Sequence, residues 1–486
     1  MGAAMHGIRR RSIEIFLVAS LTLAAGVACG GEGGTSRLAA ETSPQHGVTV
    51  RTPATSQPDD QKSLPADGSG SAADSTGTVA SGAERAPVLA WYVNPDNGGQ
   101  TAIAARCTQA AAGRYRIETQ LLPRSASDQR EQLLRRLSAQ DSSIDLISLD
   151  VAYVAEFAAA GFLAPIPNTA VPALTDGVVG PAVAGATWNG RLVAAPMWTN
   201  TELLWYRKSV AQQAGLDPSS EPVTWDQIIG AAKQTGTTVA VQALRYEGYV
   251  VFINALVESA GGHIAENPGA TADDLELGLD SPAGDQTASI IKELASSGVA
   301  GPSLSTEDEE ASRALFQGQD GGFMVNWPYV WRAAEDAVDQ GALSADVLAD
   351  IGWARYPQAI AGIASRPPLG GIDLGISPWS KHPDLALDAI RCITSAANER
   401  YYFLHDGNPA ARAAVFDDPS VLHAFPMAPL ILASLEASAP RPQTQYYSDL
   451  SEAILEKFHP PGSVNQGTPA AAQRFATAVL RGDRLP

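Results

Sequence analysis

Apolar runs of strand length alternate with amphipathic segments from residue 88 onward. The runs Val88–Val93 and Ile144–Leu149 predict buried strands, and Ile117–Leu122 predicts a third strand between them. The neighbouring segments predict helices at Gln100–Ala112, Asp128–Ala139 and Val151–Ala160, with Asp128 as the N-cap of the second helix. Because strands alternate with helices, the pattern predicts an α/β fold with a mostly parallel sheet, whose ligands bind beyond the carboxyl ends of the strands.

A polar interruption divides the apolar segment Ala194–Arg207. The residues Trp198–Thr201 are one tryptophan followed by three polar residues, and Leu203–Tyr206 is apolar again. We interpret this segment as a crossing between two lobes and predict that Asn200 offers its side chain to the gap. The segment Pro367–Asp373, rich in proline and glycine, predicts the return crossing.

The chain between these crossings repeats the alternation. Its predicted helices are Trp225–Lys233, Tyr249–Ser259, Asp285–Ser297 and Ala311–Gln317, and its predicted strands are Thr237–Gln242, Gly321–Pro328 and Ile351–Tyr356. A chain of 486 residues is long enough for two cores, since single cores stop growing near ~250–300 residues. We place lobe one at residues 86–197 and 366–408, and lobe two at residues 198–365 and 409–486.

The N-terminal segment has a different composition. Arg9–Arg11 precede the apolar run Ile13–Val27, which ends at small residues just before Cys29. This arrangement is typical of a secretory signal, and it resembles a bacterial lipoprotein signal cleaved before a lipid-modified cysteine. An ordinary export signal with an incidental cysteine is the alternative. We predict a signal peptide at residues 1–28 and a disordered tether at residues 29–85, which contain no Phe, Trp or Tyr. The protein is therefore expected outside the cytoplasm, anchored to the cell membrane by lipid.

The chain has three cysteines. If Cys29 carries lipid, Cys107 and Cys392 remain as an even pair in an oxidising compartment. We predict a disulfide between these two residues. Two buried free thiols are the alternative.

Charge and motifs exclude several classes of function. The formal net charge of −19 argues against binding to nucleic acid or to an anionic membrane surface. The seven histidines have no spacing typical of a metal site, and the chain has no nucleotide-binding P-loop. We therefore predict no metal and no cofactor.

Several short clusters, taken in their order along the chain, resemble one family of proteins. They are Leu122–Ser125 with Gln129–Arg130, Leu149–Val151 with Ala155–Phe157, Thr199–Arg207, Val325–Pro328, Gly370–Gly371 and Pro409–Arg412. The set resembles the extracellular solute-binding proteins of the maltose-binding type, above all the trehalose-binding lipoproteins of actinobacterial ABC importers. The resemblance implies a two-lobe, periplasmic-binding-protein-like fold of type II and a monomer that binds a disaccharide, trehalose. It also implies ABC permease subunits and a separate ATPase subunit as partners, with contact to the membrane only through the lipid.

The resemblance also implies a set of ligand-binding residues. A neutral sugar needs carboxylate and amide groups for its hydroxyls and an aromatic ring for its C–H face. The implied residues are Asp96, Asn97, Gln129, Asp150, Asn200, Glu309, Trp327, Gly371, Ile372 and Arg412. Among them, Trp327 would stack on the sugar, and Arg412 would donate to sugar oxygens or hold Asp150 in place.

Ordinary structural roles are also open to these side chains. Asp96 and Asn97 fit a plain turn, and Asp150 fits the cap of the helix that follows it. Gln129 fits a surface position, and Glu309 fits the solvated start of a helix.

Two further classes of function stay open at this point. Asp96 and Asp150 would also suit an exported glycoside hydrolase that works with a pair of carboxylates. A purely structural envelope lipoprotein is the other class. We predict a binding protein and not an enzyme, with maltose or another α-glucoside as the alternative ligand.

Overall fold

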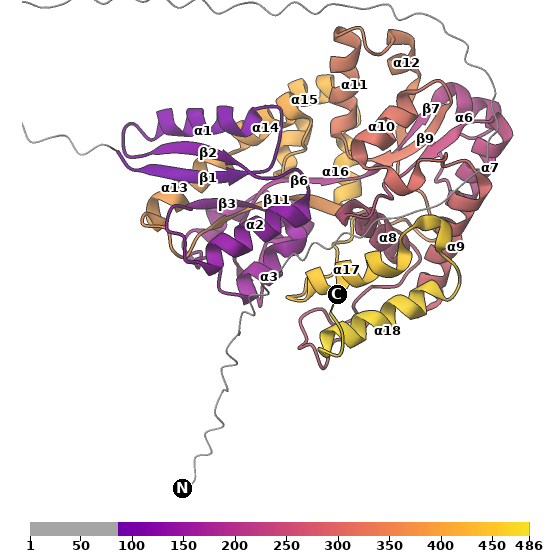
Figure 1. Cartoon of the computed structure of the whole chain (residues 1–486). Coiled ribbons are helices and arrows are strands. Elements are labelled where there is room, and N and C mark those ends of the chain that lie inside the picture. Colours follow the sequence, from indigo (N-terminus) through magenta and orange to yellow (C-terminus); the bar gives the residue numbers. More distant parts are fainter. Residues whose placement is uncertain (1–85, 486) are drawn as a thin grey trace, which may run out of the picture. The chain divides into compact units, whose positions relative to one another are not determined.

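The computed structural model describes residues 86–485, so the predicted signal peptide, Cys29 and the predicted tether lie outside the described residues. One sheet is built from β1 (Val88–Val93), β2 (Arg116–Leu121), β3 (Leu146–Asp150), β6 (Ala195–Thr201) and β11 (Leu369–Ile376). Its strand order is β2-β1-β3-β11-β6. A second sheet is built from β7 (Leu203–Arg207), β8 (Thr238–Ala240), β9 (Gly321–Asn326) and β10 (Ile351–Ala354), in the order β10-β7-β9-β8. Figure 1 shows the two sheets in separate lobes, as predicted.

The first sheet combines parallel and antiparallel pairing. β1 pairs in parallel with β2 and β3, which is the pairing that alternating strands and helices predict. In contrast, β11 runs antiparallel to β3 on one side and to β6 on the other. All residues of β11 are buried, because neighbouring strands cover both its edges and packed layers cover both its faces. A strand from the last third of the chain therefore completes the centre of the first sheet.

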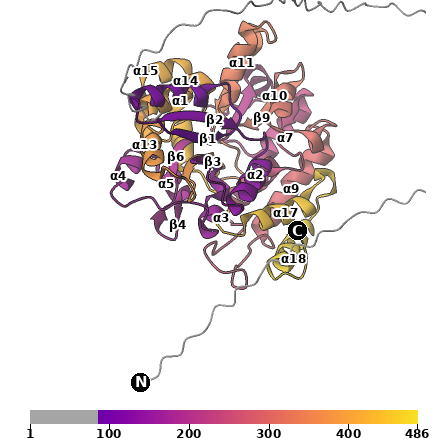
Figure 2. The same cartoon turned by 60° about the vertical axis from the view of Figure 1, so that its left-hand side comes forward.

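Helices cover both faces of this sheet. α1 (Gly99–Ala110) and α14 (Ala396–Asp406) lie on one face, and α2 (Ala126–Ser138) and α3 (Val154–Ala159) lie on the other (Figures 1 and 2). α13 (Pro383–Ile393) contacts both α1 and β11. The shorter elements of this region are the 3₁₀ turn Val151–Tyr153, α4 (Val171–Thr175), α5 (Gly180–Gly185) and the hairpin of β4 (Thr187–Trp188) and β5 (Arg191–Leu192).

Helix α2 begins earlier than the sequence pattern predicts. Ser125, and not Asp128, is its N-cap, since Ser125 Oγ accepts the backbone N–H of Asp128 at 3.1 Å. Serine and aspartate both cap helices well, so the sequence pattern does not distinguish them. The prediction chose the aspartate, but the N-cap is the serine three residues before it. Asp128 instead lies in the first turn, where its negative charge interacts favourably with the helix dipole.

The second sheet is enclosed by helices from two parts of the chain. The first part supplies α6 (Lys208–Ala214), α7 (Trp225–Thr235), α8 (Glu247–Ser259), α9 (Pro282–Ser297), α10 (Glu309–Gln317), α11 (Tyr329–Asp339) and α12 (Ala345–Asp350). The second part supplies α15 (Pro419–Ala424), α16 (Ala428–Glu436), α17 (Tyr447–Phe458) and α18 (Thr468–Leu480). Between them run the 3₁₀ turns Leu304–Thr306, Ala413–Asp417 and Pro461–Ser463.

One residue connects the two sheets at the first crossing. β6 ends at Thr201 and β7 begins at Leu203, so Glu202 alone lies between them. The boundary predicted between residues 197 and 198 falls inside β6. The return crossing lies between β10 and β11, so the predicted crossing segment Pro367–Asp373 is already largely strand.

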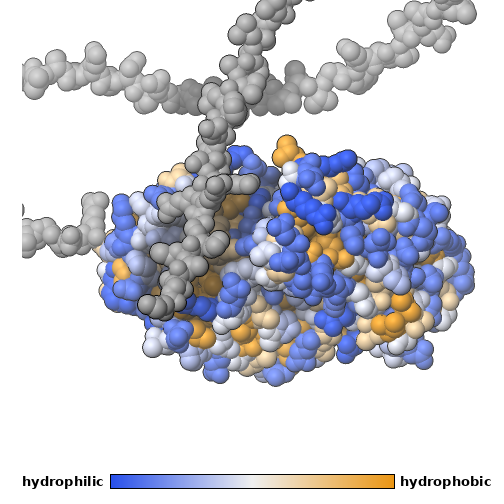
Figure 3. Space-filling view, turned by 90° about the horizontal axis from the view of Figure 1, so that it is seen from below, coloured by the Kyte–Doolittle hydropathy of each residue, from blue (hydrophilic) through white to orange (hydrophobic). Residues whose placement is uncertain are grey.

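The surface shows no broad apolar band on the face drawn in Figure 3. Hydrophilic residues cover most of that face, and hydrophobic residues form small separate groups. Within residues 86–485, no helix combines the length and the apolar character that a membrane crossing needs.

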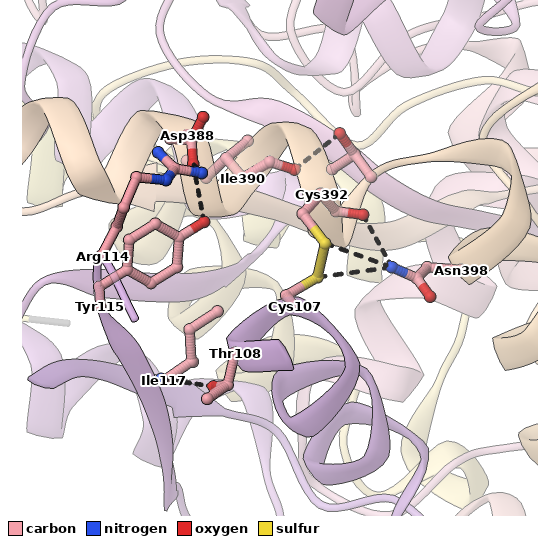
Figure 4. Close-up of a disulfide and its surroundings, with 10 residues drawn as sticks. Cys107, Thr108, Arg114, Tyr115, Ile117, Asp388, Ile390, Cys392 and Asn398 are labelled. Carbon is pink, nitrogen blue, oxygen red and sulfur yellow. Dashed lines mark hydrogen bonds and ion pairs between the residues drawn. A yellow bond between two sulfur atoms is a disulfide. The ribbon is translucent and has the colours of Figure 1, made fainter. Parts of the chain in front are cut away.

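A disulfide joins Cys107 of α1 to Cys392 of α13, which are 285 residues apart in sequence (Figure 4). The side-chain amide of Asn398 lies beside it and donates to the carbonyl oxygen of Cys392 at 2.8 Å. Cys107 is fully buried in the main core. The bond therefore ties an early helix of the first lobe to a late one.

We expect Cys107→Ala with Cys392→Ala to lower the free energy of unfolding by about 2–5 kcal/mol, because a disulfide that closes a long loop restricts the unfolded chain. Denaturant unfolding with and without reductant measures this. Reductant is expected to destabilise the wild type and to leave the double variant unchanged. A wild type that is equally stable in both conditions would contradict the expectation.

Candidate ligand-binding site

Two of the predicted site residues meet at one glycine. Asn200 of β6 is paired with Gly370 of β11. Trp327 is the first residue after β9. A Cβ atom added to Gly370 would lie 2.5 Å from Asn200 Oδ1 and 2.8 Å from Cζ3 of Trp327. Only a residue without a side chain leaves room for both groups here. The structure thus brings an amide from the first sheet and an indole from the second sheet together.

Asn200 is nearly buried, with 6% of its surface exposed. Its Oδ1 atom has no hydrogen-bond partner among residues 86–485. Trp327 is half-buried, and its backbone N–H donates to Asn326 Oδ1 at 2.8 Å, which fixes the start of the loop after β9. An acceptor without a partner beside an aromatic ring is an arrangement that a polar ligand with apolar faces satisfies.

The next residue, Gly371, allows the two crossing strands to approach closely. Its φ is 130°, and an added Cβ would lie 2.4 Å from the carbonyl oxygen of Trp198. Ile372 pairs with both Trp198 and Asp150 and is buried. Both glycines fall in the segment predicted as the return crossing, and they lie inside β11, where bulky neighbours exclude side chains.

Asp150 ends β3 and is held by two donors. Its Oδ1 accepts the backbone N–H of Ala152 at 2.9 Å and Nη2 of Arg441 at 2.7 Å. The first bond is the helix cap that the sequence suggested. The second comes from a residue that sequence reasoning missed. Arg441 stands between Pro440 and Pro442, and such a rigidly held arginine was the available clue.

Arg441 connects the two lobes. Its Nη1 donates to Oε1 of Glu247, the first residue of α8, at 2.6 Å, and only 2% of its side chain is exposed. Glu247 also accepts from the hydroxyls of Tyr447 and Ser451. Burial acts to lower the pKa of Arg441, but Asp150, Tyr447 and Glu247 outweigh it and hold that pKa well above its ordinary value. The guanidinium therefore stays charged between two carboxylates.

Arg412 does not have the role predicted for it beside Asp150. Its Nε donates to the carbonyl of Thr394 at 3.1 Å, its Nη2 donates to that of Ala173 at 3.1 Å, and its Nη1 donates to the carbonyl of Asp176. Its guanidinium also pairs with Glu399, 3.4 Å away. These bonds tie α4 to the end of α13 and occupy the donors of Arg412. Arg441 takes the place at Asp150 instead.

The loop after β1 is held mainly by its own bonds. Asp96 caps α1, since its two oxygens accept the backbone N–H groups of Gly98 at 2.9 Å and Gln100 at 2.8 Å. Asn97 is exposed, and its backbone N–H donates to Oδ1 of Asp406 at 2.8 Å. A structural role in the turn, which the sequence also allowed, therefore accounts for both carboxylate oxygens of Asp96. The side chain of Asn97 faces solvent.

Gln129 lies in the first turn of α2 and is buried, not at the surface. Its side-chain amide donates to the carbonyl oxygens of Pro123 at 2.9 Å and Arg124 at 3.4 Å. Gln129 thus fixes the loop after β2, at the carboxyl edge of the first sheet.

Two acidic residues face each other at the first crossing. Burial and the charge of Glu309 raise the pKa of Glu202 to about 8. Burial also raises the pKa of Glu309, the first residue of α10. Glu202 was missed at the sequence level, yet a charged residue inside an apolar crossing was a visible clue.

The geometry favours binding over acid–base chemistry. Asp96 is occupied as a helix cap, and Asp150 is paired with Arg441, so they do not form a free carboxylate pair. Within the described part of the chain, no three His, Cys, Asp or Glu side chains are grouped to hold a metal ion. What the crossing offers is a set of hydrogen-bonding groups around an indole ring.

Comparison with known proteins agrees with this description. Residues 111–400 match the family of bacterial extracellular solute-binding proteins. A probable ABC transporter-binding protein of Deinococcus radiodurans is 25% identical over 352 residues, which cover 68% of this chain and 79% of that protein.

Solved structures show the same fold. The maltose-bound MalE3 protein of T. maritima matches with a TM-score of 0.70 and 25% identity, covering 82% of this chain and 100% of that chain. UgpB of Mycobacterium tuberculosis, in complex with glycerophosphocholine, matches with a TM-score of 0.67 and 18% identity, covering 82% of this chain and 99% of that chain. With its two lobes and the residues gathered at their crossing, this chain belongs to the bacterial extracellular solute-binding protein family and is a substrate-binding protein of an ABC transporter.

Proposed function

We propose that the protein binds a disaccharide, trehalose, between its lobes and delivers it to the permease subunits of an ABC importer. The lobes close over the sugar, so binding free energy shifts the population toward the form that the permease recognises. Hydrolysis of ATP belongs to a separate subunit. A lipid on Cys29 anchors the protein, and the cysteine at the end of an export signal supports this placement.

The contact of Asn200 and Trp327 over Gly370 carries the proposal. A buried acceptor without a partner costs about 1–3 kcal/mol, and a ligand hydroxyl that donates to Asn200 Oδ1 removes that cost. The neighbouring indole offers a flat apolar surface for the C–H face of a pyranose ring. A ligand with hydroxyls on its rim and C–H groups on its face uses both groups at once.

The charges near the site favour a neutral ligand. Arg441 is paired with both Asp150 and Glu247, and the crossing adds Glu202 and Glu309. The charge of Arg441 is therefore already balanced by its two acidic partners, which leaves it little attraction for a phosphate ester or another anionic solute. Carboxylate oxygens accept well from the vicinal hydroxyls of a sugar.

Two observations bear on the choice of sugar. The ordered clusters around Asp150, Asn200 and Trp327 resemble trehalose-binding lipoproteins, which supports trehalose. MalE3, similar over its whole length, is bound to maltose, which makes maltose the first alternative. Both are pairs of α-linked glucose units, so the hydrogen-bonding groups described above suit either.

We expect calorimetric titration to show that trehalose binds the protein more tightly than maltose or sucrose. Asn200→Ala should weaken trehalose binding by about three- to tenfold, because a hydrogen bond to a neutral group contributes about 0.5–1.5 kcal/mol.

Thr201→Val is the matched control. Thr201 is the next residue of β6 and is equally buried, but its side chain points to the opposite face of the strand. This variant should bind like the wild type. Tighter binding of maltose would keep the site and change the sugar. Release of glucose, or binding of no sugar at all, would contradict the proposed function.

Removal of Arg441 tests the connection between the lobes. We expect Arg441→Ala to lower the free energy of unfolding by about 3–5 kcal/mol, because it leaves two buried carboxylates without a cation. Denaturant unfolding measures this.

The control removes a surface ion pair. Arg135 pairs with Glu131 one turn away on the exposed side of α2, so Arg135→Ala should lower the stability by less than about 1 kcal/mol. Equal losses in the two variants would mean that burial of the Arg441 pair has no special effect.

A further inference from the structure

Glu202 is a buried acid at the point where the two sheets join. It is the single residue between β6 and β7, and only 1% of its surface is exposed. Its Oε2 atom has no hydrogen-bond partner among residues 86–485. Both of its neighbours are fixed by strand pairing, Thr201 to Leu369 and Leu203 to Asn326. The backbone on both sides of Glu202 is therefore held in place by the two sheets.

The groups that face Glu202 supply no positive charge. They are Glu309 at the start of α10, Tyr246 just before α8 and Tyr356 just after β10. Asp308 adds a further negative charge beside Glu309. No Lys, Arg or His of the described chain forms an ion pair with Glu202 or Glu309. The ion pairs in this part of the second lobe involve other acidic residues.

This arrangement differs from the other buried acid of the site. Glu247 has Arg441 at 2.6 Å together with two hydroxyl donors. Burial raises the pKa of Glu247 as well, but Arg441 and Tyr447 oppose that shift. Glu202 lies in an equally buried position with an unpaired oxygen and a second carboxylate nearby. A buried carboxyl group in such surroundings keeps its proton, because the charged form is strongly disfavoured.

We propose that Glu202 is a positioning residue of the ligand site: it stays a neutral carboxylic acid in the strand crossing when ligand binds. The proposal rests on the proposed function of the site. Asn326 connects the pair to the ligand groups, since its amide donates to the carbonyl of Glu309 at 3.0 Å and its Oδ1 holds the backbone of Trp327. Ionisation of Glu202 would place a negative charge in the crossing beside a second acid, Glu309, with no ion-pair partner among the described residues to balance it.

The direction of the pH effect follows from burial. Burial first, and then Glu309, raise the pKa of Glu202 to about 8, above the ordinary value of 4.5. An acid with a raised pKa in the folded protein makes its full contribution to stability below its unfolded pKa and loses it as the pH rises toward the folded pKa. A ligand over Trp327 removes more water from the crossing and favours the protonated form further. Affinity should therefore fall as the pH rises through about 8, by up to about tenfold per pH unit.

The first measurement needs no ligand. Thermal unfolding of the wild type and of Glu202→Gln is followed from pH 5 to pH 9. Because glutamine cannot ionise, the midpoint of the variant should rise relative to that of the wild type by roughly 2–6 °C between pH 5 and pH 8 and then level off. A difference that does not depend on pH would overturn the proposal, whatever sugar the protein binds.

The second measurement is calorimetric titration with trehalose at pH 6, 7, 8 and 9. The wild type should lose affinity above pH 7, whereas Glu202→Gln should keep at pH 9 the affinity it has at pH 6. An identical loss in both proteins would overturn the positioning role. Absence of binding by trehalose, maltose and sucrose at pH 6, where Glu202 is neutral, would instead contradict the proposed function, and the thermal measurement would still decide the state of Glu202.

Glu399 provides a matched control. Its pKa is also raised to about 8 by burial, but it accepts the backbone N–H of Arg412 at 2.8 Å, in contacts that do not involve Asn200 or Trp327. Glu399→Gln should therefore change the dependence of stability on pH and leave the dependence of sugar affinity on pH as in the wild type. If this variant also removed the loss of affinity at high pH, the effect would belong to overall stability and the proposal would be wrong.

Discussion

A buried guanidinium between two carboxylates is the interaction on which the arrangement of the site depends. Arg441 contacts Asp150 at the end of β3 and Glu247 at the start of α8, so one side chain fixes a strand end of the first sheet against a helix of the second lobe. In a buried setting such a pair stabilises only if further donors satisfy the remaining oxygens, and Ala152, Tyr447 and Ser451 do so here. This contact adds a side-chain link between the lobes to the backbone link at the strand crossing.

The molecule buries its acids at the crossing in two different ways. Asp150 and Glu247 share the guanidinium of Arg441, which makes that contact rigid and specific in direction. Glu202 and Glu309 have no cation, so their charge depends on how much water reaches them. The ion pair ends at Asp150 in the first sheet, whereas Glu202 lies two residues after Asn200 in the crossing itself.

Much of the fold could be predicted from the sequence, because strand and helix periods and the polar interruption of the apolar crossing are local patterns. The meeting of Asn200 and Trp327 also agrees with the sequence, since both stand at the ends of predicted strands. The choice between Arg412 and Arg441 could not be made in this way. Both arginines are near the C-terminal end in loops, and only packing decides that Arg412 faces the carbonyl groups of Thr394 and Ala173. For the same reason, the pattern did not reveal that crowding by neighbours places Gly370 and Gly371 inside a strand.

The disulfide has a consequence for how the protein reaches its folded state outside the cytoplasm. Cys107 belongs to the first helix of the fold, but Cys392 lies 285 residues later, and β11 at the centre of the first sheet also comes from the late part of the chain. Because a chain is made from its N-terminus, the first lobe cannot complete its sheet or its covalent link until most of the chain is present. The strand order that makes lobe one discontinuous therefore also keeps its early half unfinished until the late half arrives.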